Sequence, residues 1–90
     1  MIVFQFFREW NLQTTLRQPS DIHLKQFGQN IIRLRNETGL TQEKVAEKTG
    51  ISWRYFQSIE AGKRWPTIVV LMRLKAALGC DWAAIFDGLR

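Results

Sequence analysis

The residues whose types and spacing could bind a partner are 52–61. We predict that they form a helix with hydrogen-bonding side chains on its outer side. On a helical wheel, Phe56 and Ile59 fall together on the inward side. The outward side then presents Trp53, Arg54, Gln57, Ser58 and Ala61, with Tyr55 on a flank. A globular protein rarely leaves tryptophan beside arginine on a solvent-exposed face without a use. We therefore expect the chemistry of the protein on this face.

The residues that most enzymes need are scarce. His23 is the only histidine, and Cys80 is the only cysteine. One chain therefore cannot assemble a His-dependent triad, a two-histidine metal site or an internal disulfide. A glycine-rich phosphate loop is absent, and Asp81 and Asp87 are expected to be a helix cap and a solvated residue rather than a catalytic pair. We predict that the protein is not an enzyme and holds no metal or cofactor.

The positive charge is concentrated in the middle of the chain. The 90 residues include 13 Lys and Arg against 8 Asp and Glu, a net charge of +5. Residues 1–24 are balanced, residues 25–78 have ten basic and four acidic side chains, and residues 79–90 have a net charge of −1. The excess therefore surrounds residues 52–61, as a partner rich in phosphate groups would require.

Composition and length indicate one small soluble domain. Hydrophobic residues make up 46% and charged residues 23% of the sequence, which is ordinary for a globular protein. No apolar run approaches the ~20 residues of a membrane helix, and residues 1–7 lack the basic start and small-residue cleavage site of a signal peptide. With its single cysteine, the protein is predicted to be cytoplasmic.

Helix caps and stops predict an all-α bundle of five helices. Candidate N-caps are Thr41, Ser52, Thr67 and Asp81, and candidate stops include Gly39, Gly50 and Gly79. The first helix should run from residue 22 or 24 to 36, and the others should follow the four caps. The expected core residues are Phe27, Ile31, Leu34, Val45, Ala46, Ile51, Phe56, Ile59, Leu71, Leu74 and Leu78, with Val70 and Ala77 as further candidates.

Residues 1–21 form an apolar extension to the domain of residues 22–90. Val3, Phe6, Phe7 and Trp10 have helical spacing, whereas Ile2, Phe4 and Phe6 alternate as in a strand; we favour a helix. Seven of the first twelve residues are large and apolar, so they need cover. The extension should pack on the domain or act as a dimerisation arm. Packing of Trp53 under the extension is the alternative to an exposed Trp53.

The spacing of residues 25–86 resembles the helix-turn-helix family of phage repressors, also called the Xre or Cro-repressor family. The matching residues are Phe27, Gly28, Ile31, Leu34, Arg35, residues 39–42, Val45, Ala46, residues 50–52, Tyr55, Phe56, Ile59, Glu60, Gly62, Lys63, Pro66, Thr67, Leu71, Ala77, Leu78, Ile85 and Phe86. The match covers about two thirds of the chain in order and without gaps. It implies a phage-repressor-like, five-helix DNA-binding domain.

The resemblance also implies roles for individual residues. Trp53, Arg54 and Ser58 match base-reading positions, with Gln57 close by; phosphate contacts are implied for Gln42, Tyr55, Lys63 and Arg64. The arginine fork suits guanine O6 and N7, although an exposed Arg54 would equally suit a phosphate. Trp53 departs from the family, which usually has a polar residue there. Gln42 and Ser58 would need no DNA if they were ordinary cap or surface residues.

Two further implications concern structure and assembly. Arg35 and Glu60 are expected to form a partly buried ion pair between the first helix and the end of the helix at 52–61. Family members bind DNA as dimers, so we expect a homodimer. Its candidate surfaces are the apolar extension and the apolar face of the last helix, formed by Trp82, Ile85, Phe86 and Leu89.

These features predict a sequence-specific, duplex-DNA-binding transcriptional regulator that acts as a nucleoid-associated homodimer with residues 52–61 in the major groove. The alternative is a protein-interaction module, such as the antitoxin of a toxin–antitoxin pair, with secondary or lost DNA binding. It is motivated by the surplus of aromatic residues, namely Phe7, Trp10, Trp53 and Trp65. A controller of a restriction–modification operon is a third possibility within the DNA-binding class.

Overall fold

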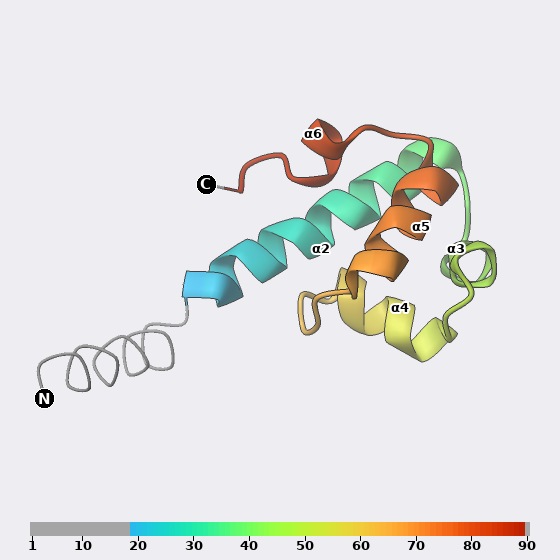
Figure 1. Cartoon of the computed structure of the whole chain (residues 1–90), viewed down its shortest axis with the longest axis horizontal. Coiled ribbons are helices and arrows are strands. Elements are labelled where there is room, and N and C mark those ends of the chain that lie inside the picture. The colour runs from blue at the N-terminus through green and yellow to red at the C-terminus, as the bar shows by residue number, and fades with distance from the viewer. Residues whose placement is uncertain (1–18, 90) are drawn as a thin grey trace, which may run out of the picture.

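Five helices make up the part of the chain that the structure, a computed structural model, describes: residues 19–89 (Figure 1). They are α2 (Pro19–Thr38), α3 (Gln42–Thr49), α4 (Trp53–Glu60), α5 (Ile68–Leu78) and α6 (Trp82–Ile85). The all-α fold class is confirmed. The predictions for residues 1–18 lie outside the described residues.

Helix α2 begins earlier than the expected residue 22 or 24. It starts at Pro19, so the predicted boundary between extension and domain falls within its first turn. A proline fits the first turn of a helix because its missing N–H would have no intrahelical partner there.

Short helices in this fold depend on their caps. Helices α3 and α4 have 8 residues each, too few to be stable alone in water. Within the described residues, four side chains accept a hydrogen bond from the first turn of the helix that follows, at distances of 2.9 to 3.2 Å: Thr41, Ser52, Thr67 and Asp81. All four are the caps predicted from the sequence, and each satisfies a backbone N–H that the helix cannot.

The turn between α3 and α4 depends on Gly50. Its φ of 72° lies in the left-handed region, and its N–H donates to Glu47 O at 3.2 Å. The next N–H, that of Ile51, donates to Ala46 O at 3.1 Å. A glycine adopts this conformation without steric cost, which lets α4 leave α3 at once and completes a helix-turn-helix.

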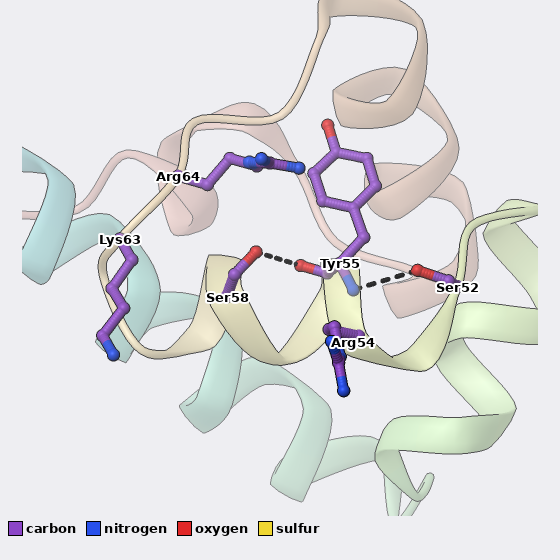
Figure 2. Close-up of a pocket in the computed structure, with 6 residues that line it drawn as sticks. All are labelled: Ser52, Arg54, Tyr55, Ser58, Lys63 and Arg64. Atoms are coloured by element: carbon purple, nitrogen blue, oxygen red, sulfur yellow. Dashed lines mark hydrogen bonds between the residues drawn. The ribbon is translucent and has the colours of Figure 1, made fainter.

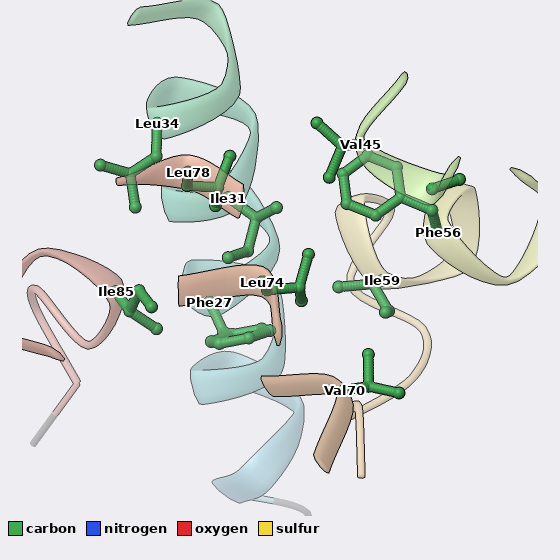
Figure 3. Packing of buried hydrophobic residues seen from close by; sticks show 11 residues of the cluster. Phe27, Ile31, Leu34, Val45, Phe56, Ile59, Val70, Leu74, Leu78 and Ile85 are labelled. Carbon is green, nitrogen blue, oxygen red and sulfur yellow. The ribbon is translucent and has the colours of Figure 1, made fainter. Parts of the chain in front are cut away.

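The core lies where α2, α3, α4, α5 and α6 meet. Helix α2 contacts α4, α5 and α6, whereas α3 contacts α4 and α5. In Figure 3, Leu74 of α5 lies between Phe27 of α2 and Ile59 of α4. The buried cluster consists of Phe27, Ile31, Leu34, Val45, Ala46, Phe56, Ile59, Val70, Leu74, Leu78 and Ile85. Leu71, expected inside, packs only partly buried against it.

Asn30 is a polar residue buried between α2 and the end of the described chain. Its Nδ2 donates to Ile85 O at 2.9 Å and to Asp87 O at 2.8 Å, and its Oδ1 accepts from Gln26 Nε2 at 3.0 Å. One amide therefore satisfies two backbone carbonyls, that of the last residue of α6 and one just after it. This is how a helix as short as α6 stays fixed on α2.

Helices α2 and α4 touch backbone to backbone at Gly28. A Cβ atom added to this residue would lie 2.7 Å from Glu60 O and 2.8 Å from Ile59 O, closer than van der Waals contact allows. Only glycine lets the end of α4 come this near. Within the described residues, no helix is both long and apolar enough to cross a membrane.

Candidate nucleic-acid interface

The outer face of α4 is accessible. Trp53, Arg54 and Gln57 are exposed and Ser58 is half-buried, whereas Phe56 and Ile59 are fully buried. The wheel therefore assigned the inward and outward sides of this helix correctly. Arg54 makes no hydrogen bond to any other described residue, which leaves all the donors of its guanidinium for a ligand.

Basic side chains surround a shallow pocket beside this face (Figure 2). Its lining consists of Ser52, Arg54, Tyr55, Ser58, Lys63 and Arg64. Three of these residues are cationic and none is acidic. The loop between α4 and α5 thus places Lys63 and Arg64 next to the exposed side of α4, and the combined charge favours an anion such as phosphate.

Arg64 is held by the ring of Tyr55. Its Cζ lies 5.2 Å from the ring centroid, within the range of a cation–π interaction. Such an interaction holds the Arg64 side chain on the same side of the pocket as Tyr55. Figure 2 shows Arg64 and Tyr55 together on one side of the pocket, with Lys63 and Arg54 on other sides.

Ser58 has part of its hydrogen-bonding capacity already used. Its Oγ donates to Tyr55 O at 2.6 Å, within the helix. With its proton committed, the hydroxyl retains only its acceptor function for a ligand.

Gln42, predicted to contact phosphate, lies between the two ends of α4. Its Nε2 donates to Glu60 Oε1 at 2.6 Å, at the last residue of that helix. Its Oε1 accepts from Trp53 Nε1 at 3.0 Å and from Gln57 Nε2 at 3.4 Å. Three of the predicted DNA-contacting residues, Gln42, Trp53 and Gln57, are therefore joined by hydrogen bonds that no sequence pattern predicts.

Glu60 is also paired with Arg35 of α2. Nε of Arg35 lies 2.7 Å from Oε2 of Glu60, and Nη2 lies 3.3 Å from Oε1. The Arg35 side chain is 17% exposed and that of Glu60 only 4%. A third donor of the guanidinium, Nη1, bonds Leu40 O at 3.1 Å. This ion pair connects the end of α4 to α2 and to the start of the helix-turn-helix.

The candidate dimer residues of the last helix do not share one surface. Trp82 and Phe86 are exposed and stacked, with ring centroids 5.9 Å apart and an interplanar angle of 12°. Leu89 is half-buried. Ile85 is fully buried in the core, so its assignment to a dimer surface is wrong: the helix is short and turns this side chain towards α2.

Helix α5 carries exposed apolar residues that the sequence pattern did not predict. Ile68, Val69 and Met72 are all exposed. Residues 68–72 are apolar without interruption, so periodicity alone could not distinguish the inner side of this helix from its outer side. The same ambiguity explains why the sequence favoured Leu71 over Val70 as a core residue, whereas in the structure Val70 is the more deeply buried of the two.

The fold and this basic, helix-borne surface define a class of DNA-binding regulators, and comparison with known proteins identifies it. The Helix-turn-helix family model (HTH_3) matches residues 31–85. The chain belongs to this family and is a helix-turn-helix DNA-binding transcriptional regulator of the Xre type, not an enzyme.

Individual relatives extend the match. The uncharacterized HTH-type transcriptional regulator y4dJ of Sinorhizobium fredii is 49% identical over 55 residues, which are 61% of this chain and 71% of that protein. Control protein C.MunI of a Mycoplasma species is 35% identical over 71 residues, 78% of this chain and 95% of that protein. The structure is similar to that of the restriction-modification controller protein C.AhdI from Aeromonas hydrophila, with a TM-score of 0.66, 33% identity, and coverage of 70% of this chain and 96% of that one.

Proposed function

We propose that the protein is a sequence-specific regulator that binds duplex DNA as a homodimer, with α4 in the major groove. The observation that supports this most directly is the exposed Arg54 on α4, which makes no hydrogen bond within residues 19–89 and lines the basic pocket. A helix of this kind fits the major groove, while cations on the adjoining loop reach the phosphates that border it.

Each residue on the outward side of α4 contacts a different part of the base pairs. Arg54 pairs bidentately with guanine O6 and N7. Ser58, which retains only an acceptor, receives a hydrogen bond from the exocyclic amino group of adenine or cytosine. Gln57 and Trp53 contact the neighbouring base pairs.

Phosphate contacts position the domain without reading sequence. Lys63 and Arg64 bind phosphate oxygens, and Tyr55 orients Arg64. Gln42 has one N–H left after its bond to Glu60, which suits a phosphate at the start of α3.

A homodimer places two copies of α4 on one side of the DNA, about one helical turn or ~34 Å apart. The dimer contact is made by one of two groups of exposed apolar residues. One group is Trp82 and Phe86, and the other is Ile68, Val69 and Met72 of α5. Sedimentation of the free protein tests whether it is a dimer. Whichever of Trp82→Ser and Met72→Ser dissociates the dimer identifies the contact surface.

The test is selection of duplexes from a random-sequence library, followed by fluorescence anisotropy at two salt concentrations. Arg54→Ala should cost ~1–3 kcal/mol on the selected site and relax its sequence preference. Lys63→Ala should weaken binding to all sequences alike and reduce the salt slope by ~1. Arg33→Ala removes the same charge from a side chain that contacts Ala84 of α6, away from the interface, and serves as the control. Absence of binding below micromolar concentration at low salt would refute the proposal.

A role as a restriction–modification controller is the more specific candidate. It is favoured by the similarity to two control proteins, C.MunI and C.AhdI, over 95% and 96% of their respective lengths. A reporter fused to the DNA upstream of the gene for this protein tests it. The reporter should respond to added protein and lose that response with Arg54→Ala.

A further inference from the structure

The indole of Trp53 has no hydrogen-bond donor left for DNA. Its N–H is the only donor of the side chain, and it is bonded to Gln42 Oε1 at 3.0 Å. The residue is nonetheless 49% exposed at the first position of α4. What it presents on the outer face is therefore the hydrocarbon part of the ring.

The orientation of the Gln42 amide is fixed from inside the protein. Its Nε2 donates to the carboxylate of Glu60 at 2.6 Å, and a carboxylate only accepts hydrogen bonds. Turning the amide over would place its oxygen against the carboxylate oxygen and its N–H₂ against the indole N–H. The bond to Glu60 therefore directs the Oε1 of Gln42, which is an acceptor, towards the indole N–H of Trp53.

Glu60 is itself held in place by Arg35, at 2.7 and 3.3 Å, and is 4% exposed. A continuous series of hydrogen bonds thus runs from Arg35 of α2 through Glu60 and Gln42 to Trp53. The last member is the only one with a large exposed surface. An interior ion pair therefore sets the position of an exposed aromatic ring.

We propose that Trp53 recognises the C5-methyl group of a pyrimidine in the major groove, and that Glu60 and Gln42 are positioning residues for this contact. The inference rests on the proposed function and names what position 53 reads. Thymine is distinguished in the major groove by its methyl group, an apolar feature, and 5-methylcytosine has the same group on the same ring carbon. An apolar ring whose donor is already used can favour these bases through the methyl group alone.

The hydrogen bonds can be tested in the free protein. The chain has four tryptophans, and the indole ¹⁵N–¹H signal lost in Trp53→Phe belongs to Trp53. That proton should exchange slowly with water, and it should shift and exchange faster in Gln42→Met, which retains the length of the side chain. Gln57→Ala removes only the longer bond to the same oxygen, at 3.4 Å, and should retain slow exchange. A Trp53 signal unaffected by Gln42→Met would overturn the inference.

The contact with DNA can be tested by removing single methyl groups. In a duplex selected by the protein, each thymine is replaced in turn by uracil, which changes nothing but the methyl group. We expect affinity to fall roughly fourfold at one thymine in each half-site, the value of about one buried methyl group. At the same position, 5-methylcytosine should bind more tightly than cytosine.

Variants test whether the hydrogen bond to the Trp53 indole is needed for the discrimination between thymine and uracil. Gln42→Met should abolish the difference between thymine and uracil, and so should Trp53→Phe, which retains a ring but has no N–H to hold it. The double variant should show no further change. Glu47→Gln, an exposed carboxylate on the same helix α3, should leave the ratio intact.

Different failures have different meanings. Sequence-selective binding with equal affinity for thymine and uracil at every position, or a ratio unchanged by Gln42→Met, overturns this inference and leaves the proposed function standing. Absence of any sequence-selective binding removes both.

Discussion

The carboxylate of Glu60 at the end of α4 is clamped by the guanidinium of Arg35 on α2, with 2.7 Å between Nε and Oε2. The same carboxylate accepts a hydrogen bond from Gln42 of α3. One acidic side chain thus joins three helices. Its consequences for stability and for the shape of the DNA-binding face follow from its burial.

Replacing Arg35 with alanine should lower the free energy of unfolding by ~3 kcal/mol. The loss is large because Glu60 would remain charged and buried with only Gln42 as a partner. Urea denaturation measures it. Lys44→Ala breaks the exposed pair with Glu47 and should cost less than ~1 kcal/mol. If the double variant Arg35→Met, Glu60→Leu is no more stable than Arg35→Ala, the stranded charge is not the cause.

Gly28→Ala should destabilise the domain by about 1–3 kcal/mol and weaken DNA binding beyond that loss. The added methyl group would meet two backbone carbonyls of α4 at 2.7 and 2.8 Å, and a backbone cannot rotate away as a side chain can. Thermal unfolding and DNA titration well below the melting temperature separate the two effects. Gln29→Ala, the next and exposed position on α2, is the matched control and should change neither.

Asn30→Ala should cost about 2 kcal/mol and loosen the end of the chain. It leaves the carbonyls of Ile85 and Asp87 without their side-chain donor. Hydrogen exchange should accelerate at the Phe86 and Leu89 amides, whose bonds form the final turns, more than in α3 or α4. Uniform acceleration throughout the domain would instead mean that Asn30 contributes only to global stability.

The thiol of Cys80 should react slowly with iodoacetamide at pH 8. Burial, reinforced by the negative charge of Asp81, raises the pKa of this thiol above its ordinary value, so less thiolate forms than in the unfolded chain. Because the folded pKa is the higher one, the stability due to this group is complete below the unfolded pKa and is lost as pH rises through the folded pKa. Cys80→Ala should therefore lose less stability than the original protein as the pH rises above about 8.5, the ordinary pKa of a thiol. Equal reaction rates for folded and urea-unfolded chains would contradict the raised pKa.

The sequence predicted the helices well because their ends have local causes. Thr41, Ser52, Thr67 and Asp81 cap helices through side chains three residues away from the amides they bond, and Gly50 makes its turn through its own φ. The division of α4 into two sides follows in the same way from a helical wheel. Such features need no knowledge of the rest of the fold.

What could not be predicted depends on contacts between distant residues. Asn30 bonds carbonyls more than fifty positions away, and Ile85 is buried only because α6 is short and turns inward. The bond from Trp53 to Gln42 crosses the turn of the motif, where no spacing rule applies. In α5, the apolar run at residues 68–72 does not distinguish the inner side of the helix from its outer side. Which of these residues are exposed depends on how α5 packs against the other helices.

The close contact at Gly28 and the amide of Asn30 have a joint geometric consequence. The first ties α4 to α2, and the second ties the end of α6 to the same helix, with α4 and α6 on opposite sides of it (Figure 1). In a dimer built on Trp82 and Phe86, α2 would be a rigid spacer between the symmetry axis and the DNA. Such a dimer would bind only half-sites at one fixed spacing. One base pair added between the half-sites rotates one of them by about 35° relative to the other. The DNA, rather than the protein, would then have to twist to restore both contacts.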